Sequence, residues 1–140
     1  MAISENVEHA RFEVFDEPGG GLVDTEISVN PGDAVTVKAS GQIWAGVFGS
    51  GTNGPEGWPG WKADNAAPLP GGTANCLVIR FGNGGWIEAG PFWEGCPDAD
   101  SGGRLQLNVN DTNPYNGDPN KRWEVFVTVT RAGAPAGVYT

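Results

Sequence analysis

The sequence predicts an all-β fold, an antiparallel β-sandwich that is jelly-roll-like, with about eight strands. Several segments alternate apolar and polar residues with a period of two, which is typical of half-buried antiparallel strands. No segment keeps a helical spacing of apolar residues long enough to form an amphipathic helix. Glycine supplies 23 and proline 11 of the 140 residues, as expected of an all-β chain with many turns.

The predicted strands follow this alternation along the chain. Leu105, Leu107 and Val109 alternate with polar residues in one segment, and Trp123 begins another alternating run. Asn30–Asp33 has the composition of a tight turn between two strands. The predicted strands are Arg11–Asp16, Leu22–Val29, Ala34–Ser40, Gln42–Phe48, Cys76–Gly82, Gly85–Ala89, Arg104–Asn110 and Trp123–Arg131.

Length and charge limit the possible classes of protein. We expect a single domain over residues 1–140, with its core at about residues 11–131, since a chain of this length can bury a hydrophobic core without crosslinks. The net charge of −9 argues against a nucleic-acid partner, which would require a basic face. No apolar run reaches membrane-spanning length, and Met1–Asn6 lacks the features of a secretory signal. We therefore expect no membrane insertion, and a protein that is cytoplasmic, exported by a non-classical route, or freed of a leader.

Cysteine and histidine are too few for common catalytic or zinc sites. Cys76 and Cys96 could form a disulfide if strand pairing brings their α-carbons within about 7 Å, or could remain free thiols. His9 is the only histidine and lies in a polar stretch, so it is expected to be solvated. Without a second histidine, no further Ser-His-Asp or Cys-His arrangement exists. We expect a protein that is not an enzyme.

The segment from Asp111 to Arg122 is rich in oxygen donors and turn formers. Asp111, Asp118 and Asn120 supply side-chain oxygens of the kind that Ca²⁺ prefers. Asp, Asn, Gly and Pro also dominate ordinary turns. The local sequence therefore leaves two interpretations open, a cation site and a solvated hairpin loop.

A second segment, Gly49–Asn75, is 27 residues long and rich in Gly, Pro, Asn and Ala. Structureless loops of this length are uncommon in compact domains and are usually functional. Trp58 and Trp61 lie within it. The two indoles could offer apolar faces to a sugar, or they could pack inward as a local core.

Several motifs, taken in order, resemble the LecA-like (PA-IL type) calcium-dependent galactose-binding lectins and related carbohydrate-binding modules. The resemblance extends from about Phe12 to Thr130 and implies a galactose-binding-domain-like sandwich. The motifs are Gly41–Gly46, Gly54–Gly57, Leu77–Asn83, and Asn110–Asp111 together with Asp118, Asn120 and Trp123.

The resemblance implies a calcium ion at one end of the sandwich, with two sugar hydroxyls completing its shell. It assigns the metal ligands to the side chains of Asp111, Asp118 and Asn120, to the loop carbonyl of Tyr115, and to the strand carbonyl of Ala45 or its neighbour Gly46. Pro119 separates what is an adjacent ligand pair in the family.

The same resemblance implies a sugar site beside the ion. Well-known members hold the sugar with a histidine and a glutamine from the long loop, and this loop has neither. Polar recognition is therefore expected from Asp64, Asn113 or Lys62. The expected ligand-binding residues are Asp111, Thr112, Tyr115, Asp118, Trp58, Trp61 and Asp64.

The resemblance therefore implies a calcium-dependent lectin for galactose-type glycans. A shallow site binds weakly, so we expect a homo-oligomer that gains avidity, held through strand edges or through apolar loop residues such as Phe92 and Trp93. One alternative is a structural or assembly domain without a sugar ligand. A remote alternative is a glycoside hydrolase using a carboxylate pair, either Asp98 with Asp100 or Asp111 with Asp118.

Overall fold

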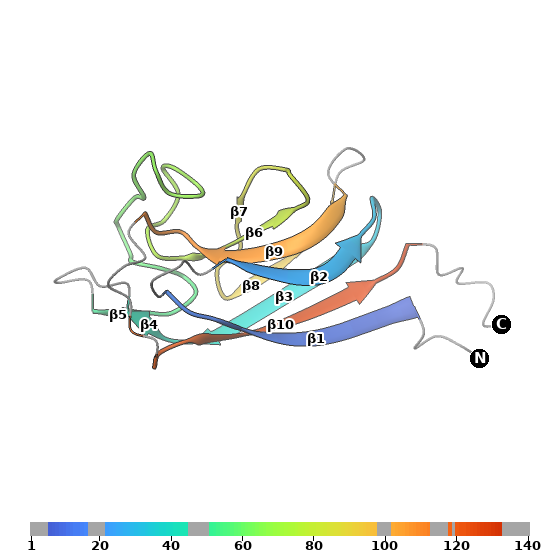
Figure 1. Ribbon diagram of the computed structural model, residues 1–140, viewed down its shortest axis with the longest axis horizontal. Helices are drawn as coiled ribbons and strands as arrows, with labels where there is room; N and C mark the ends of the chain where they lie inside the picture. Colours follow the sequence, from blue (N-terminus) through green and yellow to red (C-terminus); the bar gives the residue numbers. More distant parts are fainter. Residues whose placement is uncertain are drawn as a thin grey trace.

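The computed structural model describes residues 6–16, 22–44, 51–97, 102–112, 118 and 120–132. Within these ranges the chain forms ten β-strands and no α-helix, which confirms the predicted all-β class (Figure 1). None of the described segments is a helix that could cross a membrane. The strands are β1 (Val7–Val14), β2 (Val23–Val29), β3 (Ala34–Gly41), β4 (Ile43–Trp44), β5 (Thr52–Asn53), β6 (Leu77–Phe81), β7 (Ile87–Glu88), β8 (Phe92–Gly95), β9 (Gly103–Val109) and β10 (Trp123–Thr130).

The strands of the described part of the chain build two four-stranded antiparallel sheets and a small two-stranded one. One sheet has the order β1-β10-β3-β8 and the other has the order β2-β9-β6-β7. Figure 1 shows β2 and β9 running above β1, β10 and β3, as in a sandwich. The short β4–β5 pair lies at the end of the molecule where the green loop begins, which is the end that carries the site described below.

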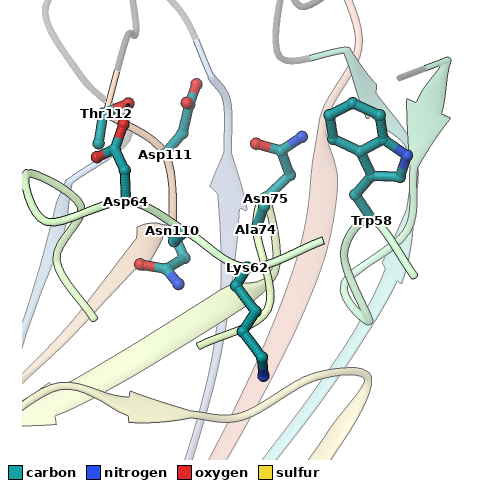
Figure 2. Close-up of a pocket in the computed structure, with 9 residues that line it drawn as sticks. Trp58, Lys62, Asp64, Ala74, Asn75, Asn110, Asp111 and Thr112 are labelled. Carbon is teal, nitrogen blue, oxygen red and sulfur yellow. Dashed lines mark hydrogen bonds between the residues drawn. The ribbon is translucent and has the colours of Figure 1, made fainter. Parts of the chain in front are cut away.

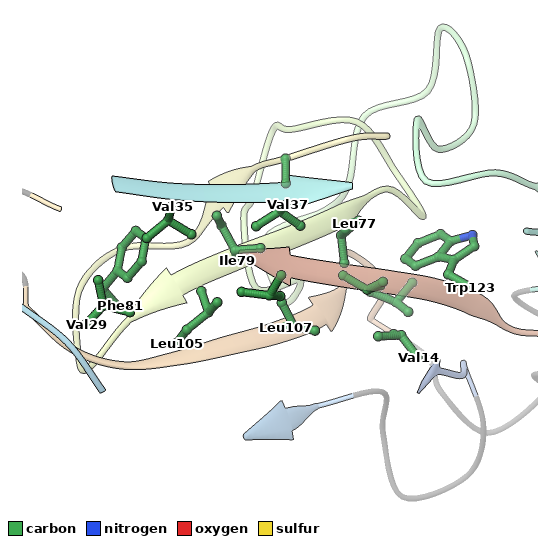
Figure 3. Packing of buried hydrophobic residues seen from close by; sticks show 14 of the residues in the cluster. Val14, Val29, Val35, Val37, Leu77, Ile79, Phe81, Leu105, Leu107 and Trp123 are labelled. Atoms are coloured by element: carbon green, nitrogen blue, oxygen red, sulfur yellow. The ribbon is translucent and has the colours of Figure 1, made fainter. Parts of the chain in front are cut away.

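Period-two alternation explains why these segments become strands. In β10, Trp123, Val125, Val127 and Val129 are buried while the residues between them are less so. A strand with this pattern covers one face of the core and leaves its other face to solvent. The buried side chains of both sheets meet in one cluster between them (Figure 3). Trp123, the largest fully buried side chain, donates its indole N–H to the Asn53 carbonyl at 3.0 Å, which satisfies its polar atom.

The structure corrects several predicted boundaries. β1 begins at Val7 rather than Arg11, because it pairs with β10 along its whole length. β8 was not predicted: Phe92 and Trp93 lie on a strand paired with β3 rather than in a loop. The predicted strand Gln42–Phe48 contains only β4 among its described residues.

The long segment is not structureless in its described part, residues 51–75. Its backbone folds back on itself, with Trp58 N–H donating to the Ala74 carbonyl at 2.8 Å and Ala74 N–H to the Trp61 carbonyl at 2.9 Å. Lys62 and Thr73 form an isolated antiparallel bridge. The segment is therefore a hairpin-like structure packed over the end of the sandwich, which gives its side chains fixed positions.

Both cysteines are free thiols in the structure. Cys76 is buried and Cys96 is exposed, so the disulfide that the sequence left open is not formed. Burial, followed by the nearby Glu88 carboxylate, raises the pKa of the Cys76 thiol to about 12. This thiol is therefore a packing residue rather than a nucleophile.

Candidate ligand-binding site

A shallow hollow of about 150 Å³ opens at one end of the sandwich, where β9 ends and the long loop folds over it. The loop contributes Trp58, Lys62 and Asp64, and the chain after β9 contributes Asp111 and Thr112. Figure 2 shows these side chains arranged around Asn75 and Asn110. Segments that are about 50 residues apart in the sequence thus form one wall each.

Asn110 joins these two walls. The residue is fully buried, and its amide N–H₂ donates to the carbonyls of Leu69 and Thr73, each at 3.0 Å. Its side-chain oxygen accepts the Leu69 N–H at 2.8 Å. A buried amide satisfied on both sides holds the loop in one arrangement against the end of β9.

Two further buried asparagines extend this network. Asn75 has a positive φ of 63°, a conformation that asparagine tolerates better than most residues. Its side chain donates to Asn53 Oδ1 at 3.2 Å, and its backbone N–H donates to the Asn110 carbonyl at 2.9 Å. Because Asn53 also accepts the Trp123 indole N–H, the hollow is tied to the hydrophobic core.

The polar side of the hollow is acidic. The Thr112 hydroxyl lies 3.3 Å from Asp64 Oδ2, while Asp64 Oδ1 accepts the N–H of Ala66 at 3.0 Å. In Figure 2 the Lys62 side chain extends away from the carboxylates of Asp64 and Asp111. The hollow therefore offers carboxylate and hydroxyl oxygens, a set suited to a hard cation or to sugar hydroxyls.

Asp16, which follows β1, lies against Asp111 and was not predicted as a site residue. It is buried, with 1% of its surface exposed. Burial, followed by the adjacent Asp111 carboxyl group, raises the pKa of Asp16 to about 9. In the sequence Asp16 is simply an acidic residue at a strand end. Its burial depends on the packing of distant strands, so no local signal could have identified it.

The aromatic side of the hollow is a stacked pair of indoles. The rings of Trp58 and Trp61 lie 4.4 Å apart between centroids, with an angle of 21° between their planes. Trp58 is half-buried and lines the hollow, whereas Trp61 is 56% exposed. The exposure of Trp61 contradicts the interpretation in which both tryptophans pack inward as a local core.

The remaining predicted site residues are placed only in part. Asp118 donates its N–H to the Trp44 carbonyl at 3.2 Å, which holds it against the end of β4, and its Oδ1 accepts the Asn120 N–H at 2.9 Å. Tyr115 and Ala45 lie outside the described residues, as do Gly46, Asn113, Pro119, Asp98 and Asp100.

The two antiparallel sheets described above define the class of fold, a β-sandwich of the kind found in lectin domains. A solved structure with which it aligns is the EclA N-terminal domain, a PllA-like lectin, at a TM-score of 0.64 and 19% sequence identity. The alignment covers 89% of this chain and 98% of that domain. No family model and no curated protein matches the sequence. The likeness supports a lectin-like fold and does not single out the LecA-like family.

Proposed function

We propose that this protein is a lectin that binds carbohydrate in the hollow at the Asp111 end of the sandwich. The observation that carries the proposal is one hollow that pairs an acidic, hydroxyl-bearing wall with the half-buried indole of Trp58, on which the exposed Trp61 stacks. Sugar hydroxyls donate hydrogen bonds to carboxylates, and sugar C–H faces pack on aromatic rings. The lectin description of the structural neighbour agrees with this proposal.

The proposed cofactor is a calcium ion beside Asp111. Calcium takes about six to eight oxygen ligands, and carboxylates, amides, backbone carbonyls and water all contribute. The described residues include no group of three or more acidic, histidine or cysteine side chains that could hold a metal alone. They do offer the Asp111 carboxylate next to a buried acidic neighbour, which fits a cation and disfavours an anion. Asp118, Asn120 and the carbonyls of Tyr115 and Ala45 would supply further oxygens, and the ion would supply a binding point for sugar hydroxyls.

The proposed ligands are galactose-type glycans, bound through two hydroxyls on the ion. Asp64 and Thr112 would accept or donate hydrogen bonds to other hydroxyls, and Trp58 would contact an apolar face of the ring. A hollow of about 150 Å³ is smaller than the pockets of about 300–1,000 Å³ that enclose drug-sized ligands. Single-site affinity should therefore be weak.

Weak single sites favour a homo-oligomer, because linked copies gain avidity through effective concentration. β8 is an edge strand of its sheet, and it exposes 54% of Phe92. Trp93 instead packs against the core and contacts Phe81 with ring centroids 5.9 Å apart. We therefore assign Phe92, and not Trp93, to the proposed contact between copies.

The test combines calcium, sugar and one substitution. Thermal unfolding of the wild type should shift upward with calcium and return with chelator, because a ligand that binds only the native state stabilises it. A glycan array should give signals with calcium that chelator removes. Asp111→Ala should abolish both responses and keep the β-sheet circular dichroism spectrum, whereas Glu94→Gln, on exposed β8, should keep both responses.

A second candidate function is that of a structural or assembly domain. Its support is an exposed aromatic row on the outer face of the first sheet, where Lys38 pairs in register with Phe126 on one side and Phe92 on the other. These two rings are 46% and 54% exposed, respectively. Self-association in sedimentation without any calcium or saccharide response would favour this function over the lectin.

A further inference from the structure

The proposed function uses Asp16 only as an acidic neighbour of Asp111 and does not make it a ligand. It lies two residues beyond the end of β1, and β1 contacts β9 across the sandwich. Asp111 lies two residues beyond the end of β9. The two carboxyl groups are close enough to interact directly. Two strand ends, one from each sheet, therefore bring their acids together behind the hollow.

A carboxylate in this position needs compensation for its charge. Burying an ionised group is costly unless donors or a cation replace the lost water. The Oδ2 atom of Asp16 accepts no hydrogen bond from any residue in the described ranges. The side chain is 99% removed from solvent, because only 1% of the residue is exposed, and the group it faces is another acid. The unbonded Oδ2 atom and the buried contact with a second acid both indicate a place for a cation at Asp16.

We propose that Asp16 is a further ligand of the cation at Asp111, so that carboxylates from both sheets bind the same ion. This inference rests on the proposed calcium-dependent function and adds a ligand that the family resemblance does not include. A divalent cation would neutralise both carboxylates and replace their repulsion with attraction. Because the number of charged ligands tunes calcium affinity, the second carboxylate should tighten binding.

The competing explanation is a carboxyl pair that shares a proton and serves only to pack this end of the sandwich. The two explanations differ in what loss of the Asp16 charge does. If Asp16 is a ligand, its neutral isostere weakens calcium binding. If it is only a packing residue, calcium binding is unchanged.

The experiment compares wild type with Asp16→Asn and Glu94→Gln in the full chain. Asn keeps the size of Asp and removes one negative charge at the hollow, while Glu94→Gln removes one negative charge from exposed β8. Calcium affinity is measured by titration calorimetry, without sugar. Thermal unfolding is recorded in chelator and in calcium, and circular dichroism checks the fold. Asp16→Ser provides the same comparison if the amide disturbs folding.

We expect Asp16→Asn to bind calcium at least about tenfold more weakly, which corresponds to about 1.4 kcal/mol. Its metal-free form should unfold at the wild-type temperature or above, and Glu94→Gln should match wild type in both measurements. Wild-type calcium affinity in Asp16→Asn would overturn the inference and leave the proposed function standing. A wild-type protein that binds no calcium at all would overturn both.

Discussion

Asn110 and Leu69 form a reciprocal pair of hydrogen bonds, with the Leu69 N–H donating to the Asn110 side chain at 2.8 Å and the Asn110 amide donating to the Leu69 carbonyl at 3.0 Å. The side chain of one buried residue thus replaces the backbone partner that Leu69 would find in a sheet. Through this pair, the end of β9 determines where the long loop lies, and so where Asp64 stands relative to Asp111.

The first prediction concerns this pair. Asn110→Ala removes the partner of the Leu69 N–H and the side-chain donor to the Thr73 carbonyl, while the Leu69 carbonyl keeps the Gly72 N–H, so the expected cost is about 1–3 kcal/mol in unfolding free energy. Urea unfolding measures the loss. Limited proteolysis should also cut residues 58–73 faster in the variant. Unchanged cleavage there would show that the loop is held by other contacts.

The second prediction concerns the indole pair. Trp58→Ala should weaken saccharide binding by about tenfold, since an aromatic contact contributes about 0.5–1.5 kcal/mol beyond its buried area. Trp61→Ala should have a smaller effect, because Trp61 acts by supporting Trp58. Trp86→Ala is the matched control, since Trp86 lies beyond the other end of β6, beside Arg80. Calorimetry with calcium present provides the affinities, and an equal loss in all three variants would argue against a role for the stacked pair.

The third prediction concerns Gly57, in the motif Gly54–Gly57. Gly57 has a φ of +85°, and a Cβ placed on it would lie 2.6 Å from the Ala74 carbonyl oxygen. Gly57→Ala should therefore lower the free energy of unfolding by at least about 1–3 kcal/mol. Gly60→Ala is the control for backbone strain alone, because its φ is +80° and nothing lies within 4 Å of the added atom. Equal losses in the two variants would contradict the steric explanation.

The fourth prediction is a pH dependence that originates at Asp33. Burial would raise the pKa of this carboxyl group, but hydrogen bonds from the N–H groups of Ala132 and Asn30 and from Arg131 outweigh it, so the pKa lies below its usual 3.8. A lowered folded-state pKa contributes stability that is present above pH 3.8 and is lost as the pH falls through the folded value.

Asp33→Asn removes this contribution. The variant should be less stable than wild type at about pH 7 and should approach it as the pH falls below about 3. Urea unfolding at several pH values measures the difference. A gap that stays constant over that range would assign the stabilisation to packing rather than to the charge of Asp33.

The sequence predicts the fold well where the information is local. The inward positions of β3, β9 and β10 follow from alternation of apolar and polar residues, which depends only on neighbours in the chain. β8 escapes such a pattern because Phe92–Gly95 is short, and its partner β3 lies more than 50 residues earlier. The first residues of β1 escape it too, since His9 and its neighbours become a strand by pairing with β10.

The site divides in the same way. Asp111 was predicted from its local oxygen-rich sequence and from the resemblance, Thr112 and Asp64 from the resemblance, and Trp58 from the long loop, and the structure brings these four around one hollow. Asn110 belongs to the motif Asn110–Asp111, but neither its burial nor that of Asn53 and Asn75 was predicted, because an asparagine at a strand end or among glycines is indistinguishable from an ordinary turn residue. Only the folded chain shows that Asn53, Asn75 and Asn110 are buried, and that Asn75 is hydrogen-bonded to the other two.

The hollow is built from segments that are far apart in the sequence. One side comes from residues 58–64 and the other from residues 110–112, with β1 behind them. The long loop is held by the Asn110 side chain at the end of β9, so it can dock only after β9 has its place in the sheet. A partly folded chain with β3 and β10 already paired would still lack the hollow. Recovery of ligand binding after dilution from denaturant should therefore lag behind recovery of β-sheet circular dichroism, and the interval between them would time the docking of the long loop.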